Sequence, residues 1–380
     1  MKILIITSHS HNNVGGIETY SLKIIHLLLN NFKNIEIDEF ITESDNLSSN
    51  LDNVKIIRNN YKKSKINFID YYRKIINTRN SIYLLNYKNK YDLIIDNTSY
   101  FFKKLNNLNH YIWVQHFDIT VYDNLNIKNR FKRICIKLYK KIFLRIKNPF
   151  LNNYNIVVFD NETSKIIINS LNRNAKLPLP NIISIGSSNN FNEINNIENR
   201  KRIIYFGRID ETQKNISKLI QINKKINLID FYGDVTDNRE ENLKLLYQLK
   251  INNFYKGKIN KNDLNSILQK YKYMILYSTY EGFPVSIVES LSNALPIIVR
   301  NSFLSASYLC NKSTGFLLNY NFDKDDLINK ILEIYNINNN SYINLVRNLK
   351  IFFSVNLDIS VFNKKWLDLI NKCLKLNKLD

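Results

Sequence analysis

Short apolar runs alternate with helical patterns along most of the chain. In the first half, four runs are typical of buried strands: Lys2–Ile6, Tyr91–Ile95, His110–Val114 and Asn155–Phe159. Between Ile17 and Phe32, apolar residues recur at helical spacing and predict an amphipathic helix. This alternation predicts parallel β-α-β units with helices on both faces of a sheet.

The second half repeats the pattern. Its strand candidates are Arg202–Phe206, Asn227–Tyr232, Asn253–Tyr255, Tyr273–Tyr277 and Leu295–Val299. A stretch rich in Asn, Ser and Ile, roughly residues 179–199, interrupts the alternation and indicates a domain junction. We therefore expect two doubly wound α/β domains, over residues 1–185 and 186–358, followed by a terminal helix over residues 359–380.

The segment from Ser278 to Glu289 carries two carboxylates, Glu281 and Glu289, eight positions apart. It follows a predicted strand, and a helix is expected to start near Val285, directly after Pro284. Free N–H groups at that helix start favour an anion, and carboxylates accept hydrogen bonds from hydroxyls. The pattern is typical of a site for a phosphorylated, polyhydroxylated ligand. The alternative interpretation is one exposed Glu on a loop and one solvated Glu on a helix.

Glycines and cations mark the ends of other predicted strands. The chain has only eight glycines, and four of them follow predicted strands of the second half: Gly207, Gly233, Gly257 and Gly282. Glycine lets a ligand approach the backbone closely, and open α/β sheets bind ligands at their carboxyl edge. The loop after Phe206 offers Arg208 and Lys214, which together can neutralise a diphosphate. Taken alone, this loop favours two solvated surface cations, and the Glu281 segment further along the chain favours a binding site instead.

Several of these segments resemble one enzyme family. The Glu281–Glu289 segment resembles the E-x7-E segment of retaining, nucleotide-sugar-dependent glycosyltransferases of the GT-B fold, specifically the GT4 family. The Arg208–Lys214 loop resembles that family's G-R-x(4 or 5)-K motif. Residues 15–18 resemble its G-G-x-E loop, and His116 in Trp113–Asp118 resembles its strand-end histidine. The resemblance is specific mainly from Phe206 to Val299.

The resemblance implies two domains facing across a cleft. The first is the acceptor side, the second binds the nucleotide sugar, and the terminal helix returns to the first. Arg208 and Lys214 would neutralise the leaving diphosphate, Glu281 would hold the donor sugar and His116 would orient it, so these four are the candidate catalytic residues. Glu289 would hold the ribose. The implied donor-binding set is Gly16, Arg208, Lys214, Gly233, Ser278, Gly282, Phe283, Pro284, Val285, Ser286 and Glu289.

The implied mechanism is front-face attack with retention, in which the leaving phosphate oxygen takes the acceptor's proton. No cofactor and no metal are expected, because no Asp-x-Asp lies at a predicted strand end. The chain departs from the family pattern where Ala294 occupies the usual Gly position, which packing tolerates if its φ is negative. It also departs at the junction, over Pro180–Ser188. Gly16 could approach the donor phosphates or the acceptor, and His9 and His11 have no assigned role.

Charge adds a second candidate function. The 380-residue chain carries a formal net charge of +21, which implies an anionic partner. Nine Lys and Arg residues and no acid lie between Asn126 and Phe150, with apolar residues at helical spacing. Such a basic amphipathic helix is typical of binding to an anionic membrane surface, although a domain helix with a solvated basic face is the alternative. We expect no nucleic acid partner, because no recognition motif accompanies the charge.

The three cysteines are scattered and odd in number, which favours a reducing cytoplasm. No signal peptide or membrane span is expected, so the predicted location is cytoplasmic and peripheral, at the inner face of the cell membrane. The sequence thus predicts a hexosyl- or N-acetylhexosaminyl-transferase for surface polysaccharide, lipopolysaccharide or glycolipid synthesis, with a glycan or lipid-linked glycan acceptor. The alternatives are a nucleotide-sugar epimerase or hydrolase of the same fold, or a non-catalytic membrane-surface adaptor.

Overall fold

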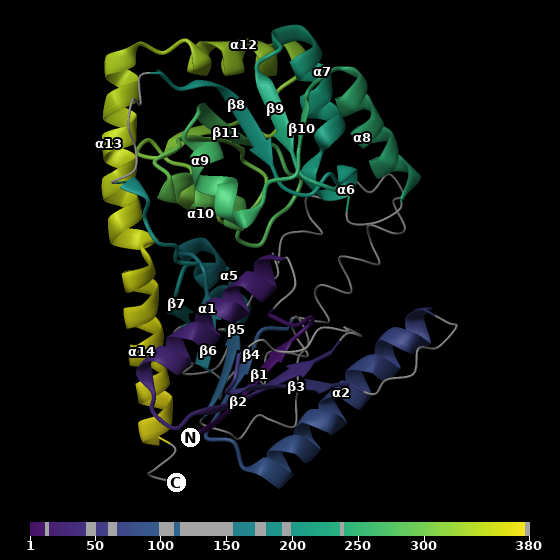
Figure 1. Ribbon diagram of the computed structural model, residues 1–380, viewed down its shortest axis with the longest axis vertical. Coiled ribbons are helices and arrows are strands. Elements are labelled where there is room, and N and C mark those ends of the chain that lie inside the picture. The colour runs from purple at the N-terminus through teal and green to yellow at the C-terminus, as the bar shows by residue number, and fades with distance from the viewer. Residues whose placement is uncertain are drawn as a thin grey trace. The chain divides into compact units, whose positions relative to one another are not determined.

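The computed structural model describes residues 1–11, 15–42, 51–59, 67–98, 110–114, 155–171, 180–191, 199–235 and 239–376 (Figure 1). These residues form two compact units. The first unit holds the described residues between Met1 and Ile183 and those from Asn363 onward, and the second holds Ser184–Phe362.

The first unit is built on a seven-stranded sheet whose strand pairs are all parallel, in the order β3-β2-β1-β4-β5-β6-β7. Its strands are β1 (Lys2–Thr7), β2 (Glu36–Ile41), β3 (Val54–Arg58), β4 (Leu93–Asp96), β5 (Tyr111–Val114), β6 (Asn155–Val158) and β7 (Asn181–Ile182). Its helices include α1 (Gly16–Asn31), α2 (Asn67–Asn89) and α5 (Asn161–Leu171).

The second unit repeats this architecture with six parallel strands in the order β10-β9-β8-β11-β12-β13. The strands are β8 (Lys201–Phe206), β9 (Ile229–Tyr232), β10 (Tyr255–Gly257), β11 (Tyr271–Leu276), β12 (Ile297–Arg300) and β13 (Gly315–Leu318). The helices are α6 (Glu211–Lys214), α7 (Ile216–Ile226), α8 (Glu240–Ile251), α9 (Leu264–Leu268), α10 (Val285–Ser292), α11 (Ala306–Leu309), α12 (Lys324–Tyr335) and α13 (Asn339–Asn356).

The apolar runs form the strands because both faces of each sheet are covered. Residues 3–6 of β1 and 273–275 of β11 are fully buried. Parallel sheets carry helices on both faces, so their strands are continuously apolar. In the second unit, β9 and β12 lie on opposite sides of the β8–β11 pair. Right-handed crossovers therefore place α7 and α10 on opposite faces of that sheet, and α10 packs on β11, β12 and α13 (Figure 1).

Four strands were not predicted from the sequence: β2, β3, the two-residue β7 and β13. In β2 the charged residues Asp38 and Glu39 interrupt the apolar pattern, yet both are buried. Burial is possible because each carboxylate is paired: Tyr91 Oη donates to Asp38 at 2.6 Å, and His11 Nδ1 lies 2.7 Å from Glu39. Only the folded structure supplies these partners.

The boundaries of two predicted strands also shift. β9 begins at Ile229, because Asn227 ends α7 in a left-handed conformation with φ of 47°. β10 begins at Tyr255 for the same reason, since Asn253 has φ of 56° in the turn after α8. Asn tolerates this conformation better than most residues, so both positions are turns.

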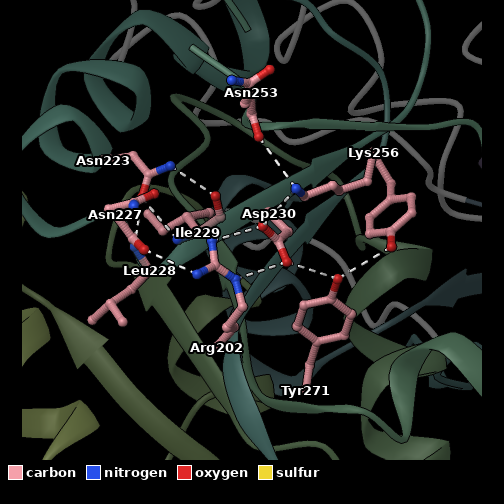
Figure 2. A network of polar contacts seen from close by, with 10 residues as sticks. Arg202, Asn223, Asn227, Leu228, Ile229, Asp230, Asn253, Lys256 and Tyr271 are labelled. Atoms are coloured by element: carbon pink, nitrogen blue, oxygen red, sulfur yellow. Dashed lines mark hydrogen bonds and ion pairs between the residues drawn. The ribbon is translucent and has the colours of Figure 1, made fainter. Parts of the chain in front are cut away.

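A polar network fastens four strands of the second unit at their amino ends (Figure 2). Asp230 on β9 accepts two hydrogen bonds from the Arg202 guanidinium on β8, at 2.9 and 2.8 Å. The Tyr271 hydroxyl on β11 donates to the same carboxylate at 3.0 Å, and Lys256 on β10 lies 3.8 Å from it. Because these residues lie at the amino edge of the sheet, the network leaves the carboxyl edge available for other chemistry.

The last helix, α14 (Ile359–Leu376), has residues in both units. Ile359 N donates to Ser187 O at 2.9 Å in the second unit. In the first unit, the buried Trp366 donates from Nε1 to the Tyr20 hydroxyl of α1 at 3.0 Å. Helix α14 therefore contributes a large buried side chain to the core of the first unit.

Candidate functional site

The strand order of the second unit reverses beside β8, which pairs with β9 on one side and β11 on the other. At such a reversal the loops after the two central strands diverge, and ligands bind in the crevice at their carboxyl ends. The loop after β8 carries Arg208 and leads into α6 with Lys214, whereas the loop after β11 carries Ser278 and Glu281. Two motifs far apart in the sequence therefore lie at one edge of one sheet.

Glu281 is the centre of a buried polar cluster, and the residue is only 5% exposed. Its Oε1 accepts from Lys214 Nζ at 2.5 Å and from Ser278 Oγ at 2.7 Å. Its Oε2 accepts from Gln213 Nε2 at 3.0 Å. A carboxylate has about four acceptor positions, so Glu281 retains capacity for a ligand hydroxyl. The buried cation and carboxylate hold each other in place.

Gln213 joins Arg208 to this cluster, and sequence reasoning missed it. One amino group of the exposed Arg208 guanidinium donates to Gln213 Oε1, while Gln213 Nε2 donates to Glu281. Gln213 is neutral and matches no motif position that the sequence analysis used. The only available signal was its place directly before Lys214 on the loop with the two cations.

The short helix α6 explains why neighbouring side chains face different surroundings. Asp210 caps α6 by accepting from Gln213 N at 3.0 Å, and Arg239 holds the same carboxylate at 3.1 Å. The Gln213 carbonyl accepts from Thr279 N at 2.7 Å, which fastens α6 to the loop after β11. Lys214, at the last position of α6, is 8% exposed. One turn of helix thus buries Lys214 next to Glu281 while Arg208 stays in solvent.

Tyr205, on β8, supports this loop from the core. Its hydroxyl donates to the Arg208 carbonyl at 2.6 Å. Burial, and then the negative charge of Glu281, raise the pKa of Tyr205 well above its usual range. The hydrogen bond from this protonated hydroxyl keeps the Arg208 backbone in place.

Helix α10 starts at Val285 with Pro284 as its N-cap, as the sequence predicted. No side chain caps this end, so the first N–H groups, including that of Ser286, have no side-chain partner at the cap. The preceding loop is held by Gly282, whose carbonyl accepts from Ser305 Oγ at 3.0 Å, and by Phe283, whose buried ring lies 6.4 Å from the Tyr308 ring. Such a helix start at a carboxyl edge favours an anion.

Glu289 lies one turn into α10 and is half-buried. Its backbone carbonyl accepts from Ser292 Oγ and Asn293 Nδ2, both at 2.9 Å. The contact of its carboxylate with a ribose stays a prediction.

Two glycines let the ends of β8 and β9 approach each other. Gly207 and Gly233 have φ of 150° and 148°, which L side chains rarely adopt. A Cβ on Gly233 would lie 1.8 Å from the Gly207 carbonyl oxygen, so the close approach requires glycine. The other two glycines assigned to strand ends differ, because Gly257 is the last residue of β10 and Gly282 lies in the loop before α10. Gly315 is a strand residue whose Cβ would overlap the Ile297 carbonyl.

Ala294 departs from the condition that the sequence analysis set. Its φ is +46°, not negative, so this buried alanine occupies the left-handed region. Its carbonyl accepts from Arg200 at 2.7 Å, and the neighbouring Asn293 carbonyl accepts from the same guanidinium at 3.0 Å. Arg200 thus fastens the turn between α10 and β12.

In the first unit the strand order reverses between β1 and β4. The loop after β1 ends at Gly15, the N-cap of α1, and Gly16 is the exposed first residue of that helix. Glu18 lies in the first helical turn, where a carboxylate complements the helix dipole, and it is 7% exposed. Gly16 therefore presents exposed backbone at the same kind of strand-order reversal as in the second unit.

His11 lies in this loop and is paired with Glu39 of β2. Glu39 accepts from His11 N at 2.9 Å, and the His11 ring Nδ1 lies 2.7 Å from its second oxygen. Both side chains are fully buried. The pair fastens the loop to β2, which gives His11 a structural role that the sequence did not reveal. His116 and the basic segment Asn126–Phe150 lie outside the described residues.

In the part of the chain that the structure describes, no group of three or more His, Cys, Asp or Glu side chains is placed to hold a metal ion. The described helices include none that is long and apolar enough to cross a membrane.

Residues 187–350 match the family described as Glycosyl transferases group 1. A 74-residue stretch is 35% identical to the UDP-Gal:alpha-D-GlcNAc-diphosphoundecaprenol alpha-1,3-galactosyltransferase of Escherichia coli. This match spans 20% of the chain and 19% of the length of that relative.

Solved structures resemble nearly the whole chain. A sucrose-phosphate synthase from Thermosynechococcus elongatus has a TM-score of 0.73 at 14% identity, covering 99% of both chains. The Anabaena protein HepE in complex with UDP and glucose has a TM-score of 0.66 at 14% identity, covering 98% of this chain and 99% of the other. At such low identity the likeness is one of fold, and it confirms the predicted GT-B fold class.

Proposed function

Because residues 187–350 belong to the Glycosyl transferases group 1 family, we propose that the protein transfers a sugar from a nucleotide-diphosphate donor to a hydroxyl group. The observation that carries the proposal is the buried Lys214–Glu281 pair, with Arg208 close by, at the strand-order reversal of the second unit. Two cations beside a carboxylate that retains acceptor capacity suit a ligand with both phosphates and hydroxyls. A nucleotide sugar has both.

Each residue has a proposed role in this chemistry. Arg208 and Lys214 neutralise the charge that develops on the leaving diphosphate, and the N–H groups at the start of α10 add to this stabilisation. Glu281 accepts hydrogen bonds from the donor sugar hydroxyls, and Glu289 accepts from the ribose. Gly16 and His116 act from the first half of the chain, His116 by orienting the sugar. Ser278 holds Glu281 in position through their 2.7 Å hydrogen bond.

The proposed reaction retains the configuration of the transferred sugar. The acceptor hydroxyl attacks the anomeric carbon on the face that the diphosphate leaves. The bond from that carbon to the phosphate oxygen breaks, and this oxygen takes the acceptor's proton. In this proposal the two cations do the work that a metal ion does in other glycosyltransferases, so transfer proceeds without a metal.

The relatives suggest the substrate class. The E. coli relative is named for a UDP-galactose donor and a diphosphoundecaprenol-linked acceptor, and HepE was solved with UDP and glucose. We extend this to a UDP-hexose or UDP-N-acetylhexosamine donor and a glycan or lipid-linked glycan acceptor in surface polysaccharide, lipopolysaccharide or glycolipid synthesis. A lipid-linked acceptor would explain a basic membrane-binding segment at Asn126–Phe150 and a location at the cytoplasmic face of the membrane.

The proposal is tested by combining thermal shift and product analysis. A panel of nucleotide sugars should raise the melting temperature, with one donor standing out, because stabilisation follows RT ln(1 + [L]/Kd). Product analysis with that donor, with and without acceptors, separates transfer from epimerisation or hydrolysis.

Arg208→Ala should lose roughly 100-fold in transfer rate, the order expected for one electrostatic donor. Arg347→Ala, which removes an exposed arginine of α13, is the matched control. Full transfer activity in Arg208→Ala would refute the assignment.

A further inference from the structure

Gln213 lies between Arg208, which is proposed to bind the diphosphate, and Glu281, which is proposed to bind the sugar. Its Oε1 accepts from the Arg208 guanidinium, and its Nε2 donates to Glu281 Oε2 at 3.0 Å. Nε2 also lies 3.4 Å from the Tyr280 carbonyl. The amide therefore connects the loop after β8 with the loop after β11.

Its two ends cannot be exchanged. A guanidinium only donates hydrogen bonds, so it must meet the amide oxygen, and a carboxylate only accepts, so it must meet the amide nitrogen. Among side chains of this length, glutamine has a neutral group that accepts at one end and donates at the other. Glutamate at this position would accept only, and methionine would do neither.

The backbone of Gln213 is held as firmly as its side chain. Its N–H donates to the Asp210 cap at 3.0 Å, and its carbonyl accepts from Thr279 N at 2.7 Å. With both backbone groups and both ends of the amide bonded, Gln213 has little freedom to adopt another rotamer. A side chain fixed in this way restricts the partners that it touches.

The neutral amide also preserves the charge of the site. Among the four side chains, Arg208 and Lys214 carry one positive charge each, Glu281 carries one negative charge and Gln213 carries none. A carboxylate in place of the amide would pair with Arg208 and cancel the excess positive charge that attracts a diphosphate. It would also place a second negative charge beside Glu281.

We propose that Gln213 is a positioning residue. It couples the diphosphate-binding residue Arg208 to the sugar-binding residue Glu281. It holds the guanidinium near the carboxylate without forming a direct ion pair between them. The inference rests on the proposed function, since it assigns those two roles to Arg208 and Glu281. It predicts that the phosphate and sugar halves of a donor bind cooperatively through this amide.

The test measures the affinity of UDP and UDP-glucose for the full chain by calorimetry. Gln213→Met should weaken UDP binding about tenfold, since a lost hydrogen bond to a charged group corresponds to about that factor. It should also reduce the ratio of UDP-glucose affinity to UDP affinity, because Glu281 loses one of its fixed partners. Gln221→Met, which replaces an exposed glutamine of α7, should leave both values unchanged.

Gln213→Glu separates charge from position. It should bind UDP about tenfold more weakly than Gln213→Met at low salt, because it subtracts one unit of positive charge at the site. This additional loss should shrink as salt rises, whereas the loss in Gln213→Met should persist, since screening acts on charge and not on side-chain position. Melting temperatures without ligand identify any loss that comes from the fold.

The outcomes distinguish the two proposals. If the unaltered protein binds neither UDP nor UDP-glucose, the proposed function fails and this inference fails with it. If the unaltered protein binds both, and Gln213→Met binds both within twofold of it with the same affinity ratio, the coupling role alone is overturned. A weaker UDP affinity with an unchanged ratio would also overturn the coupling.

Discussion

The Glu281 carboxylate is surrounded by hydrogen-bond donors. Three side chains donate to its carboxylate, and one of them is the buried Lys214. Removing the charge while keeping the shape tests whether the carboxylate acts on the donor sugar or only stabilises the loop.

Glu281→Gln should lower the transfer rate roughly 100-fold, because an amide accepts more weakly from the sugar hydroxyls and leaves Lys214 without its counter-charge. Transfer kinetics with the preferred donor measure this loss. Exposed Glu333→Gln on α12 is the control, and it should leave the rate unchanged. A rate for Glu281→Gln within fivefold of the unaltered protein would contradict the donor-holding role.

Gly233 and Gly257 provide a second comparison at the scale of single residues. Both have positive φ, but a Cβ on Gly257 meets nothing within 4 Å, whereas one on Gly233 meets the Gly207 carbonyl at 1.8 Å. Gly257→Ala should cost about 1–3 kcal/mol in free energy of unfolding from backbone strain alone. Gly233→Ala should cost clearly more, because two backbones must separate. Urea unfolding measures both, and equal losses would mean that the close approach is not needed.

At the scale of elements, the amino and carboxyl edges of the second sheet do different work. The carboxyl edge brings together Lys214 and Glu281, with Arg208 linked to them through Gln213, and the amino edge holds the Arg202–Asp230–Tyr271 network (Figure 2). The network links β8 to β9 and β11, the strands that flank the reversal. By linking these strands, the network holds in place the starting points of the loops that carry Arg208 and Glu281.

Asp230→Asn should lower the free energy of unfolding by about 2 kcal/mol, since Asp230 is buried but its partner Arg202 is partly exposed. Lys330→Gln breaks an exposed ion pair with Glu333 on α12 and should cost less than about 1 kcal/mol. Chemical denaturation of the two variants checks the difference. If both variants lost the same small free energy of unfolding, the network would contribute no more to stability than an exposed ion pair.

At the scale of the whole molecule, α14 completes the first unit with residues from the far end of the chain. Trp366 is fully buried and packs edge-on against Tyr20, with ring centroids 6.2 Å apart. Trp366→Ala should destabilise the first unit by about 3–5 kcal/mol, the cost of truncating a buried tryptophan. Hydrogen exchange should show faster exchange in α1 and unchanged protection in β8 and β11. Lys364→Ala, at an exposed position of the same helix, should change neither.

The net charge of +21 is also a property of the whole molecule. If the basic segment binds membrane, replacing Lys137, Lys140, Lys141 and Arg145 with Gln should weaken binding to anionic liposomes by up to roughly a thousandfold, since each cation contributes about 1 kcal/mol. Replacing four exposed lysines elsewhere, Lys224, Lys225, Lys364 and Lys372, is the charge-matched control. Co-sedimentation at low salt measures both. No binding by the unaltered protein would exclude a membrane surface as partner.

The sequence by itself determined the features that depend on neighbouring residues. Continuous apolar runs predicted β1, β8 and β11, because strands buried on both faces need apolar side chains throughout. Pro284 and Val285 marked the start of α10, because proline fits the first turn of a helix and not its interior. The loops with Arg208 and Glu281 could also be identified, because the residues of each motif are close together in the sequence.

Tertiary structure decided what depends on distant partners. Strand β2 was not predicted because burying its two carboxylates is unfavourable unless Tyr91 and His11 pair with them, and these partners are distant in the sequence. Gln213 was not identified because its amide becomes important only through its two partners. These are the Arg208 guanidinium and the Glu281 carboxylate, and Glu281 lies on the loop after a different strand. The strand order that places Lys214 against Glu281, 67 residues apart, follows from the packing of whole β-α-β units. Local patterns specify elements, but long-range burial and pairing decide which side chains meet.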